Sequence, residues 1–322
     1  MAASFPEKRP TLTDVARAAG VSGMTVSRVV RGTKVVKAKT VARVRQAISK
    51  LGYQPDPALS ALAAYRTNRA GSGQGNGLAF IDCDGTPYSA NVLAGVKQEA
   101  AWLGYGVESF RLPTETAARR RLGRLLFHRG FHGVLIGPSD VSWKFEGWDW
   151  SQFAAVSIGA LVHEPALHAV AMDYFQGAMD GAQTLREHGC RRIALAVEGA
   201  LETRTNHRWI GGYSAWCGGV GQSALYLGPM QGAAALGKNV RRQRIDGVLT
   251  IHRVVWNALH DRGVKVFFLN EVESPATASH LALEPGKIGA EGVRVLHPML
   301  LRREFGLPDH PKMVGLRGAL VV

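Results

Sequence analysis

The chain has few cysteines and no long apolar run. Its three cysteines among 322 residues are Cys83, Cys190 and Cys217. They are far apart and odd in number, which excludes a disulfide framework and fits a reducing compartment. No apolar stretch approaches the roughly 20 residues that a membrane-spanning helix needs. The first ten residues lack the apolar core of a secretion signal. We therefore expect a cytoplasmic protein with no membrane partner.

Sequence motifs for catalysis and metal binding are also missing. There is no Gly-x-x-x-x-Gly-Lys-Ser/Thr phosphate loop and no Gly-x-Ser-x-Gly nucleophile turn. His128 and His132 are four residues apart, but Gly130 lies between them, which disfavours a helical metal pair. We expect no enzyme activity, no metal and no cofactor.

Positive charge is concentrated at the N-terminus. Residues 1–70 hold thirteen Lys and Arg against three acidic residues, which is +10 of the net +14. Such a field attracts a polyanion and makes its binding depend on salt. A charge run alone more often marks a solvated basic face. Here the basic segment coincides with the helical motif described next, which favours nucleic acid.

Two short helical patterns meet at a Gly-Val-Ser break. Apolar residues recur at helical spacing on both sides of Gly20, which can adopt positive φ where the first helix ends. Ser22 can cap the second helix. The pattern predicts helices from Thr11 or Thr13 to Gly20, from Ser22 to about Val30, and from about Ala38 to Leu51. The first two form a helix-turn-helix.

The motif itself is specific. The run Thr-Leu-Thr-Asp-Val-Ala-Arg-Ala-Ala-Gly-Val-Ser-x-x-Thr-Val-Ser-Arg-Val, followed by Lys-Thr, Leu-Gly-Tyr and Pro55, resembles the headpiece of the lac repressor (LacI/GalR) family of bacterial transcription regulators. The resemblance implies a DNA-binding headpiece in residues 1–54, a hinge helix and linker in 55–76, and a two-lobed effector and dimerisation domain in 77–322. It also implies association with the nucleoid.

The resemblance implies which residues contact DNA. The second helix of such a motif lies in the major groove, so Gly23, Met24 and Arg28 would face base edges, while Thr25 and Ser27 would reach phosphates. Arg28 suits a guanine and Met24 a thymine methyl. Gly23 is smaller than the residue many relatives carry there, which removes one base contact. The full expected set is Thr11, Ser22, Gly23, Met24, Thr25, Ser27, Arg28, Arg31 and Leu62.

Leu62 belongs to this set through the hinge. Residues 55–65 begin Pro-Asp-Pro and place Leu59, Leu62 and Ala63 on one side of a short helix. In the family this helix orders on DNA in a dimer, and a leucine at the position of Leu62 wedges into the minor groove. The alternative is an ordinary leucine of dimer packing.

After a Gly-rich linker at residues 66–76, strands alternate with helices. Such alternation indicates parallel sheets built of βαβ units. The series is long enough for two sheets, as in the family's pair of Rossmann-like lobes. The expected fold is an all-α helix-turn-helix headpiece followed by an α/β, periplasmic-binding-protein-like domain of two lobes. The expected strands are 78–81, 106–110, 133–136, 154–158, 169–172, 193–197, 224–227, 247–251, 264–269, 280–283 and 313–316.

Polar residues at strand ends are the candidates for binding a small-molecule effector. Ligands of open parallel sheets bind beyond the carboxyl ends of the strands, where the sequence places Asp82, Ser139, Asn270 and Glu271. The family also uses an arginine shortly before a Gly-Tyr pair, and Arg208 matches it. Because glycine is doubled in Arg-Trp-Ile-Gly-Gly-Tyr, the register stays open by one residue. Arg208 could instead form a salt bridge at the rim.

The resemblance implies a homodimeric repressor of carbohydrate-related genes that binds a palindromic operator in double-stranded DNA and a small-molecule effector, most often a sugar. One departure from relatives, Ile-His252-Arg where Asn-Asp is common, indicates a pocket remodelled for another ligand or a lost sensing function. A solute-binding protein of the same two-lobed fold, and an enzyme on this scaffold, are the alternatives. The fold alone does not distinguish a regulator from these two alternatives, so the prediction of a regulator rests on the headpiece.

Overall fold

The computed structural model describes residues 10–30, 36–53, 77–139, 141–159, 164–199, 203 and 205–322. Contacts within the chain define two compact units, residues 1–73 and residues 74–322. Arg31 and the hinge residue Leu62 lie outside the described residues, as does the linker at 55–76. Their expected roles stay predictions.

The described residues of the first unit form three helices, α1 (Leu12–Ala19), α2 (Gly23–Val30) and α3 (Ala38–Leu51). The predicted boundaries are confirmed to within a residue or two. Gly20 and Gly52 end α1 and α3 at φ values of 59° and 62°. Apolar side chains from all three helices form one small core, namely Val15, Ala16, Ala19, Val26, Val29, Val44 and Ala47. The local sequence is sufficient to specify this domain because its helices are short, capped and amphipathic.

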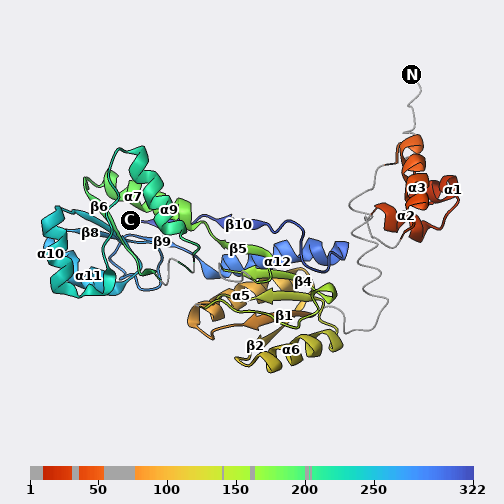
Figure 1. Ribbon diagram of the computed structural model, residues 1–322, viewed down its shortest axis with the longest axis horizontal. Helices are drawn as coiled ribbons and strands as arrows, with labels where there is room; N and C mark the ends of the chain where they lie inside the picture. Colours follow the sequence, from red (N-terminus) through yellow and green to blue (C-terminus); the bar gives the residue numbers. More distant parts are fainter. Residues whose placement is uncertain are drawn as a thin grey trace, which may run out of the picture. The chain divides into compact units, whose positions relative to one another are not determined.

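The second unit contains two sheets, each flanked by helices on both faces (Figure 1). The first lobe has six parallel strands in the order β10-β5-β4-β3-β1-β2. They are β1 (Gly77–Asp82), β2 (Gly106–Arg111), β3 (Gly133–Ile136), β4 (Ala154–Ile158), β5 (His168–Met172) and β10 (Met313–Leu316). Helices α5 (Pro87–Trp102) and α12 (Pro285–Arg302) cover one face, and α6 (Thr116–His128) covers the other.

In the described residues of the second lobe, five strands follow the order β11-β9-β8-β7-β6, and β11 alone among them is antiparallel to its neighbour. The strands are β6 (Ile193–Ala196), β7 (Gly247–Thr250), β8 (Lys265–Phe268), β9 (His280–Ala282) and β11 (Ala319–Val321). Helices α7 (Tyr174–Glu187) and α9 (Arg208–Gly219) pack on one face. Helices α10 (Ala233–Gln243) and α11 (Arg253–Leu259) pack on the other. The two-lobed α/β fold predicted from the alternating pattern is confirmed.

The chain crosses between the lobes more than once. It leaves the first lobe after β5, builds β6 to β9 of the second, returns to the first as α12 and β10, and ends in the second as β11. Each lobe is therefore assembled from segments far apart in the sequence. The order of strands and helices along the chain does not reveal these returns.

Two local expectations differ from the structure, and two further elements were missed. The predicted strand at 224–227 is a single bridge between Tyr226 and Leu195, since the chain turns into Gly228 and Pro229 immediately afterwards. The spacing of apolar residues predicts a helix from Val92 to Leu103, but α5 already begins at Pro87, because the Thr86 side chain caps it by accepting a hydrogen bond from the Ser89 N–H. Helix α10 and strand β11 were not predicted from the sequence.

Candidate nucleic-acid interface and ligand cavity

The turn between α1 and α2 is fixed by a side-chain cap. The Ser22 hydroxyl accepts a hydrogen bond from the Thr25 N–H at 3.2 Å and contacts the Thr25 hydroxyl at 2.9 Å. Gly20 provides the left-handed residue that ends α1. This pair of local devices sets the angle at which α2 leaves the turn, so it also sets the direction of the exposed face of α2.

Helix α2 has one buried and one exposed face. Val26 and Val29 face the core, with 0% and 9% of their surface exposed, whereas Met24 is 65% exposed and Arg28 is also on the surface. A Cβ on Gly23 would come no closer than 3.4 Å to Leu12, so packing leaves room for a side chain there. The small residue at position 23 is therefore not demanded by the fold.

Thr11 is the N-cap residue of α1. Its hydroxyl donates to the Asp14 carboxylate at 2.6 Å, and its backbone N–H donates to the same carboxylate at 2.9 Å. The Asp14 N–H in turn donates to the Thr11 hydroxyl at 3.3 Å. This reciprocal arrangement is a capping box, which stabilises the start of α1. Its expected contact with DNA stays a prediction beside this structural role, as do those of Ser22 and Thr25.

At the carboxyl end of β1, Asp82 is held by its own lobe. It accepts hydrogen bonds from the Ser89 hydroxyl at 2.8 Å and the Gly85 N–H at 3.1 Å, and it forms an ion pair with Arg111 at 2.9 Å. Burial acts to raise the pKa of Asp82, but the hydrogen bonds from Ser89, Arg111 and Gly85 and the charge of Arg111 outweigh it, so the pKa is lowered. Asp82 is therefore a charged, tightly held carboxylate.

The other predicted strand-end residues also bond within their lobes. The Ser139 hydroxyl accepts hydrogen bonds from the Trp143 indole N–H at 3.0 Å and the Val141 N–H at 3.2 Å. The side-chain oxygen of Asn270 accepts from the Val272 N–H, and the Glu271 carboxylate accepts from the Leu283 N–H. These bonds stabilise the loops after β3 and β8. The predicted roles of Ser139, Asn270 and Glu271 in ligand binding remain predictions.

The structure resolves which glycine of the Gly-Gly doublet is required for packing. A Cβ at Gly212 would lie 2.0 Å from the Phe175 carbonyl oxygen, whereas one at Gly211 would meet Phe175 only at 3.5 Å. The next residue, Tyr213, is fully buried and donates its hydroxyl to the Ile193 carbonyl. Four residues before it, Trp209 is buried too. Arg208 directly precedes Trp209, in the first turn of α9, and is partly exposed.

Arg208 lines a cavity to which both lobes contribute. The cavity has a volume of about 180 Å³. From the first lobe it is lined by Ser157, Ala166, Leu167, Ala169, Pro311, Lys312 and Met313, and from the second by Thr205, Asn206 and Arg208. Asn206 and His207, just before α9, both have positive φ, at 54° and 57°. Such backbone conformations are strained in residues other than glycine and are frequent beside ligand sites.

The sequence did not identify most of this lining. Ser157, Asn206 and Lys312 come from three distant segments, and no local pattern connects them. Lys312 follows the Gly-Leu-Pro-Asp-His-Pro stretch after α12, which passes from the last helix to β10. Only the pairing of β10 with β5 brings this stretch beside Ala169. Among the predicted effector residues, Arg208 alone lines this cavity.

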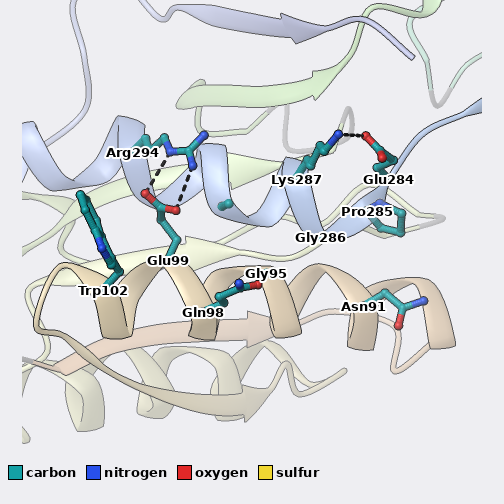
Figure 2. A pocket seen from close by; sticks show the side chains of 11 residues that line it. Asn91, Gly95, Gln98, Glu99, Trp102, Glu284, Pro285, Gly286, Lys287 and Arg294 are labelled. Atoms are coloured by element: carbon teal, nitrogen blue, oxygen red, sulfur yellow. Dashed lines mark hydrogen bonds and ion pairs between the residues drawn. The ribbon is translucent and has the colours of Figure 1, made fainter. Parts of the chain in front are cut away.

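A second surface feature lies between α5 and α12 (Figure 2). The helices approach so closely that a Cβ on Gly95 would lie 1.9 Å from the Gly286 carbonyl oxygen. Beside this contact, Glu99 accepts two hydrogen bonds from Arg294, at 2.9 and 3.0 Å, and Trp102 at the end of α5 is 82% exposed. Glycine contacts of this kind join the two helices into one layer, so the groove is a fixed feature of the first lobe.

Within the described ranges, no helix combines the length and apolarity needed to cross a bilayer. In the same residues, no group of three His, Cys, Asp or Glu side chains is placed to hold a metal ion. The two candidate functional sites are the exposed face of α2 and the cavity at Arg208.

Residues 11–56, which begin at the α1 cap and run past α3, match the family model described as bacterial regulatory proteins, lacI family. The N-terminal domain is a lacI-family domain. The lacI-family headpiece thus comprises the capped turn, the exposed face of α2 and the three-helix core described above.

Curated relatives match the chain over longer stretches than the headpiece. Catabolite control protein A of Priestia megaterium is 28% identical over 198 residues, which cover 61% of this chain and 57% of that protein. The sucrose operon repressor of Escherichia coli is 40% identical over 121 residues, 37% of this chain and 35% of that protein. The matched region thus spans only about a third to somewhat over half of these relatives' length.

Solved structures with a lacI-family fold resemble the whole chain. The lac repressor dimer bound to operator and an anti-inducer shows a TM-score of 0.57 at 18% identity, with 98% of each chain covered. A complex of the regulator CelR with cellobiose shows a TM-score of 0.55 at 21% identity, covering 98% of this chain and 99% of that one. At these identities the likeness shows the fold: a headpiece followed by two α/β lobes.

Proposed function

We propose that the protein is a homodimeric, sequence-specific DNA-binding transcription regulator, a repressor of carbohydrate-related genes, whose operator affinity is set by a small molecule bound between its lobes. The observation that carries this proposal is the capped helix-turn-helix with Met24 and Arg28 on its exposed face. The names of the relatives, a sucrose operon repressor and a catabolite control protein, support the carbohydrate link.

Two copies are required by the geometry of recognition. One helix-turn-helix reads a single half-site, and a palindromic operator presents two half-sites related by twofold symmetry. A short hinge helix is also marginal alone, so a second copy beside it would help it to order on DNA. The lac repressor dimer bound to operator, which shares this fold, supports the arrangement. We place the protein in the cytoplasm, associated with the nucleoid.

The cavity at Arg208 would couple ligand to DNA. Its lining comes from both lobes, so a ligand that contacts both binds best when they are close together. A ligand shifts an equilibrium only by its differential affinity for the two states. A ligand at this position would therefore shift the equilibrium between open and closed lobes, and through the hinge it would change the affinity for the operator. The coupling free energy is reciprocal, so operator binding would change the ligand affinity by the same factor. Asp82, Ser139, Asn270 and Glu271 stay in the proposed effector set as contacts of a ligand that extends beyond this cavity, since they do not line it.

The function of a solute-binding protein of the same fold does not require a basic helix-turn-helix domain. We therefore favour the transcription regulator. The test is selection of bound duplexes from a random DNA pool by the purified full-length protein at near-physiological salt. We expect enrichment of one palindrome with a flexible central step. If the protein bound all DNA sequences equally, both with and without candidate sugars, the proposal would be contradicted.

A further inference from the structure

The cavity at Arg208 contains two positive charges contributed by different lobes. Arg208 comes from the first turn of α9, and Lys312 precedes β10. Neither residue is close to the other in sequence, and the crossing of the chain between the lobes brings both to one cavity of about 180 Å³. Among the described residues that line it, none is acidic.

The two cations have no ionic partner of their own within the described part of the chain. Every ion pair found there that involves arginine or lysine uses other residues, such as Arg111 with Asp82 and Arg294 with Glu99. Arg302 holds both oxygens of the nearby Glu304 carboxylate, at 2.5 and 3.0 Å, and its hydrogen bonds together with the charges of Arg302 and Lys312 lower the pKa of Glu304. Lys312 is exposed, so in the described residues neither it nor Arg208 has a carboxylate of its own in the cavity.

The remaining polar lining consists of small neutral groups. The Ser157 hydroxyl donates to the His168 carbonyl at 3.4 Å, so it can only accept from a ligand, whereas Asn206 supplies an amide that can donate hydrogen bonds. Thr205 is the third polar residue of this neutral lining. Amide donors suit the oxygens of a phosphate or carboxylate and the hydroxyls of a sugar alike. Since both cations line the same cavity, an anion would be attracted by both, whereas a neutral sugar would neutralise neither.

We propose that the effector carries an anionic group, a phosphate or a carboxylate, which sits between Arg208 of the second lobe and Lys312 of the first. This inference rests on the effector-controlled function proposed above and names the chemical class of the ligand. It also gives the coupling a physical cause. Without ligand the two cations repel across the cavity, and a shared anion converts that repulsion into an attraction between the lobes.

The experiment uses the full-length protein and inorganic phosphate as the simplest probe. Thermal unfolding is followed against phosphate concentration, with chloride holding the ionic strength constant. We expect saturable stabilisation of the wild-type protein and at least a tenfold weaker apparent affinity in the double variant Arg208→Gln, Lys312→Gln. The control Arg186→Gln, Lys238→Gln loses the same charge at exposed positions of α7 and α10 and keeps the wild-type response.

Matched ligands then define the anionic group. Glucose, glucose 6-phosphate and glucuronate are compared by calorimetry. We expect one or both anions to bind at least tenfold more tightly than glucose, with Arg208→Lys retaining most of that preference and Arg208→Gln losing it. The tighter of the two identifies phosphate or carboxylate.

Two results would overturn the inference: equal phosphate responses in the wild-type protein and the cavity double variant, or glucose binding as tightly as its anionic derivatives. The DNA selection described above stays independent of both. A selected palindrome together with either result leaves the regulator in place and removes only the anionic effector. Conversely, anion binding that depends on Arg208 and Lys312 in a protein without DNA specificity removes the regulator and keeps the anion site.

Discussion

Gly212 in α9 lies against the backbone of Phe175 in α7, where an added Cβ would stand 2.0 Å from the Phe175 carbonyl oxygen. This contact fixes the rotation of α9 about its axis. It directs Trp209 and Tyr213 into the core and leaves Arg208 at the cavity.

Substitution of Gly212 by alanine should therefore destabilise the second lobe. Backbone atoms cannot yield as a flexible side chain does, so we expect a loss of at least about 2 kcal/mol in the free energy of unfolding, measured by denaturant titration. The control is Gly211→Ala, whose Cβ meets only the Phe175 ring at 3.5 Å and which gains helix propensity. Equal effects of the two substitutions would contradict this account of the α7–α9 contact.

Arg28→Gln should reduce operator binding selectively. A bidentate contact to a guanine contributes about 1–3 kcal/mol of discrimination, so we expect roughly a 10- to 100-fold loss on the selected operator. Affinity for a scrambled duplex should change far less. Fluorescence anisotropy at fixed salt measures both, with Lys50→Gln, exposed at the end of α3, as a control for lost charge. If both duplexes lost the same affinity, Arg28 would be a phosphate contact.

Leu62→Ala tests the hinge, which lies outside the described residues. If Leu62 wedges into a central base step, its loss should weaken binding to the palindrome far more than binding to nonspecific DNA, because only the specific complex is kinked. Operators with a stiff central step should then no longer be discriminated from those with a flexible one. An equal loss on specific and nonspecific DNA would leave Leu62 as a packing residue.

His252 should make stability depend on pH. It is 4% exposed, its Nε2 accepts a hydrogen bond from the Glu198 N–H, and burial lowers its pKa below the ordinary 6.5 despite the charges of Glu273 and Glu198. Below about pH 6.5 the unfolded chain therefore binds a proton that the folded chain does not, so stability falls as the pH decreases from 7 towards the lowered pKa.

The measurement is the unfolding midpoint of wild-type protein and His252→Asn between pH 7.5 and 5.5. We expect a shallower loss with decreasing pH in the variant, because a buried histidine with a lowered pKa has been removed. The variant His310→Asn, at an exposed position, should retain the wild-type slope. His168 and His297 also have pKa values lowered by burial, so part of the slope will remain in His252→Asn.

The sequence alone determined the headpiece. Gly20, Ser22 and the apolar spacing around them specify α1 and α2 through contacts between residues only a few positions apart, and the caps lie where the pattern predicts them. The alternation of strands and helices likewise predicted the class of fold, because each βαβ unit is local in the chain. The net positive charge of residues 1–70 can be counted from the sequence without a structure.

Tertiary structure decided what the local pattern could not. The register of Arg208 depends on how α9 packs against Phe175, and the presence of Arg208 and Lys312 in one cavity depends on the chain returning to the first lobe after β9. The sequence predicts Asp82 and Ser139 as effector contacts, and only the tertiary structure shows that Arg111 pairs with Asp82 and that the Trp143 indole N–H donates to Ser139. Residues separated by a hundred positions meet only because two sheets are completed by distant strands, and no periodicity within a helix or strand encodes such a meeting.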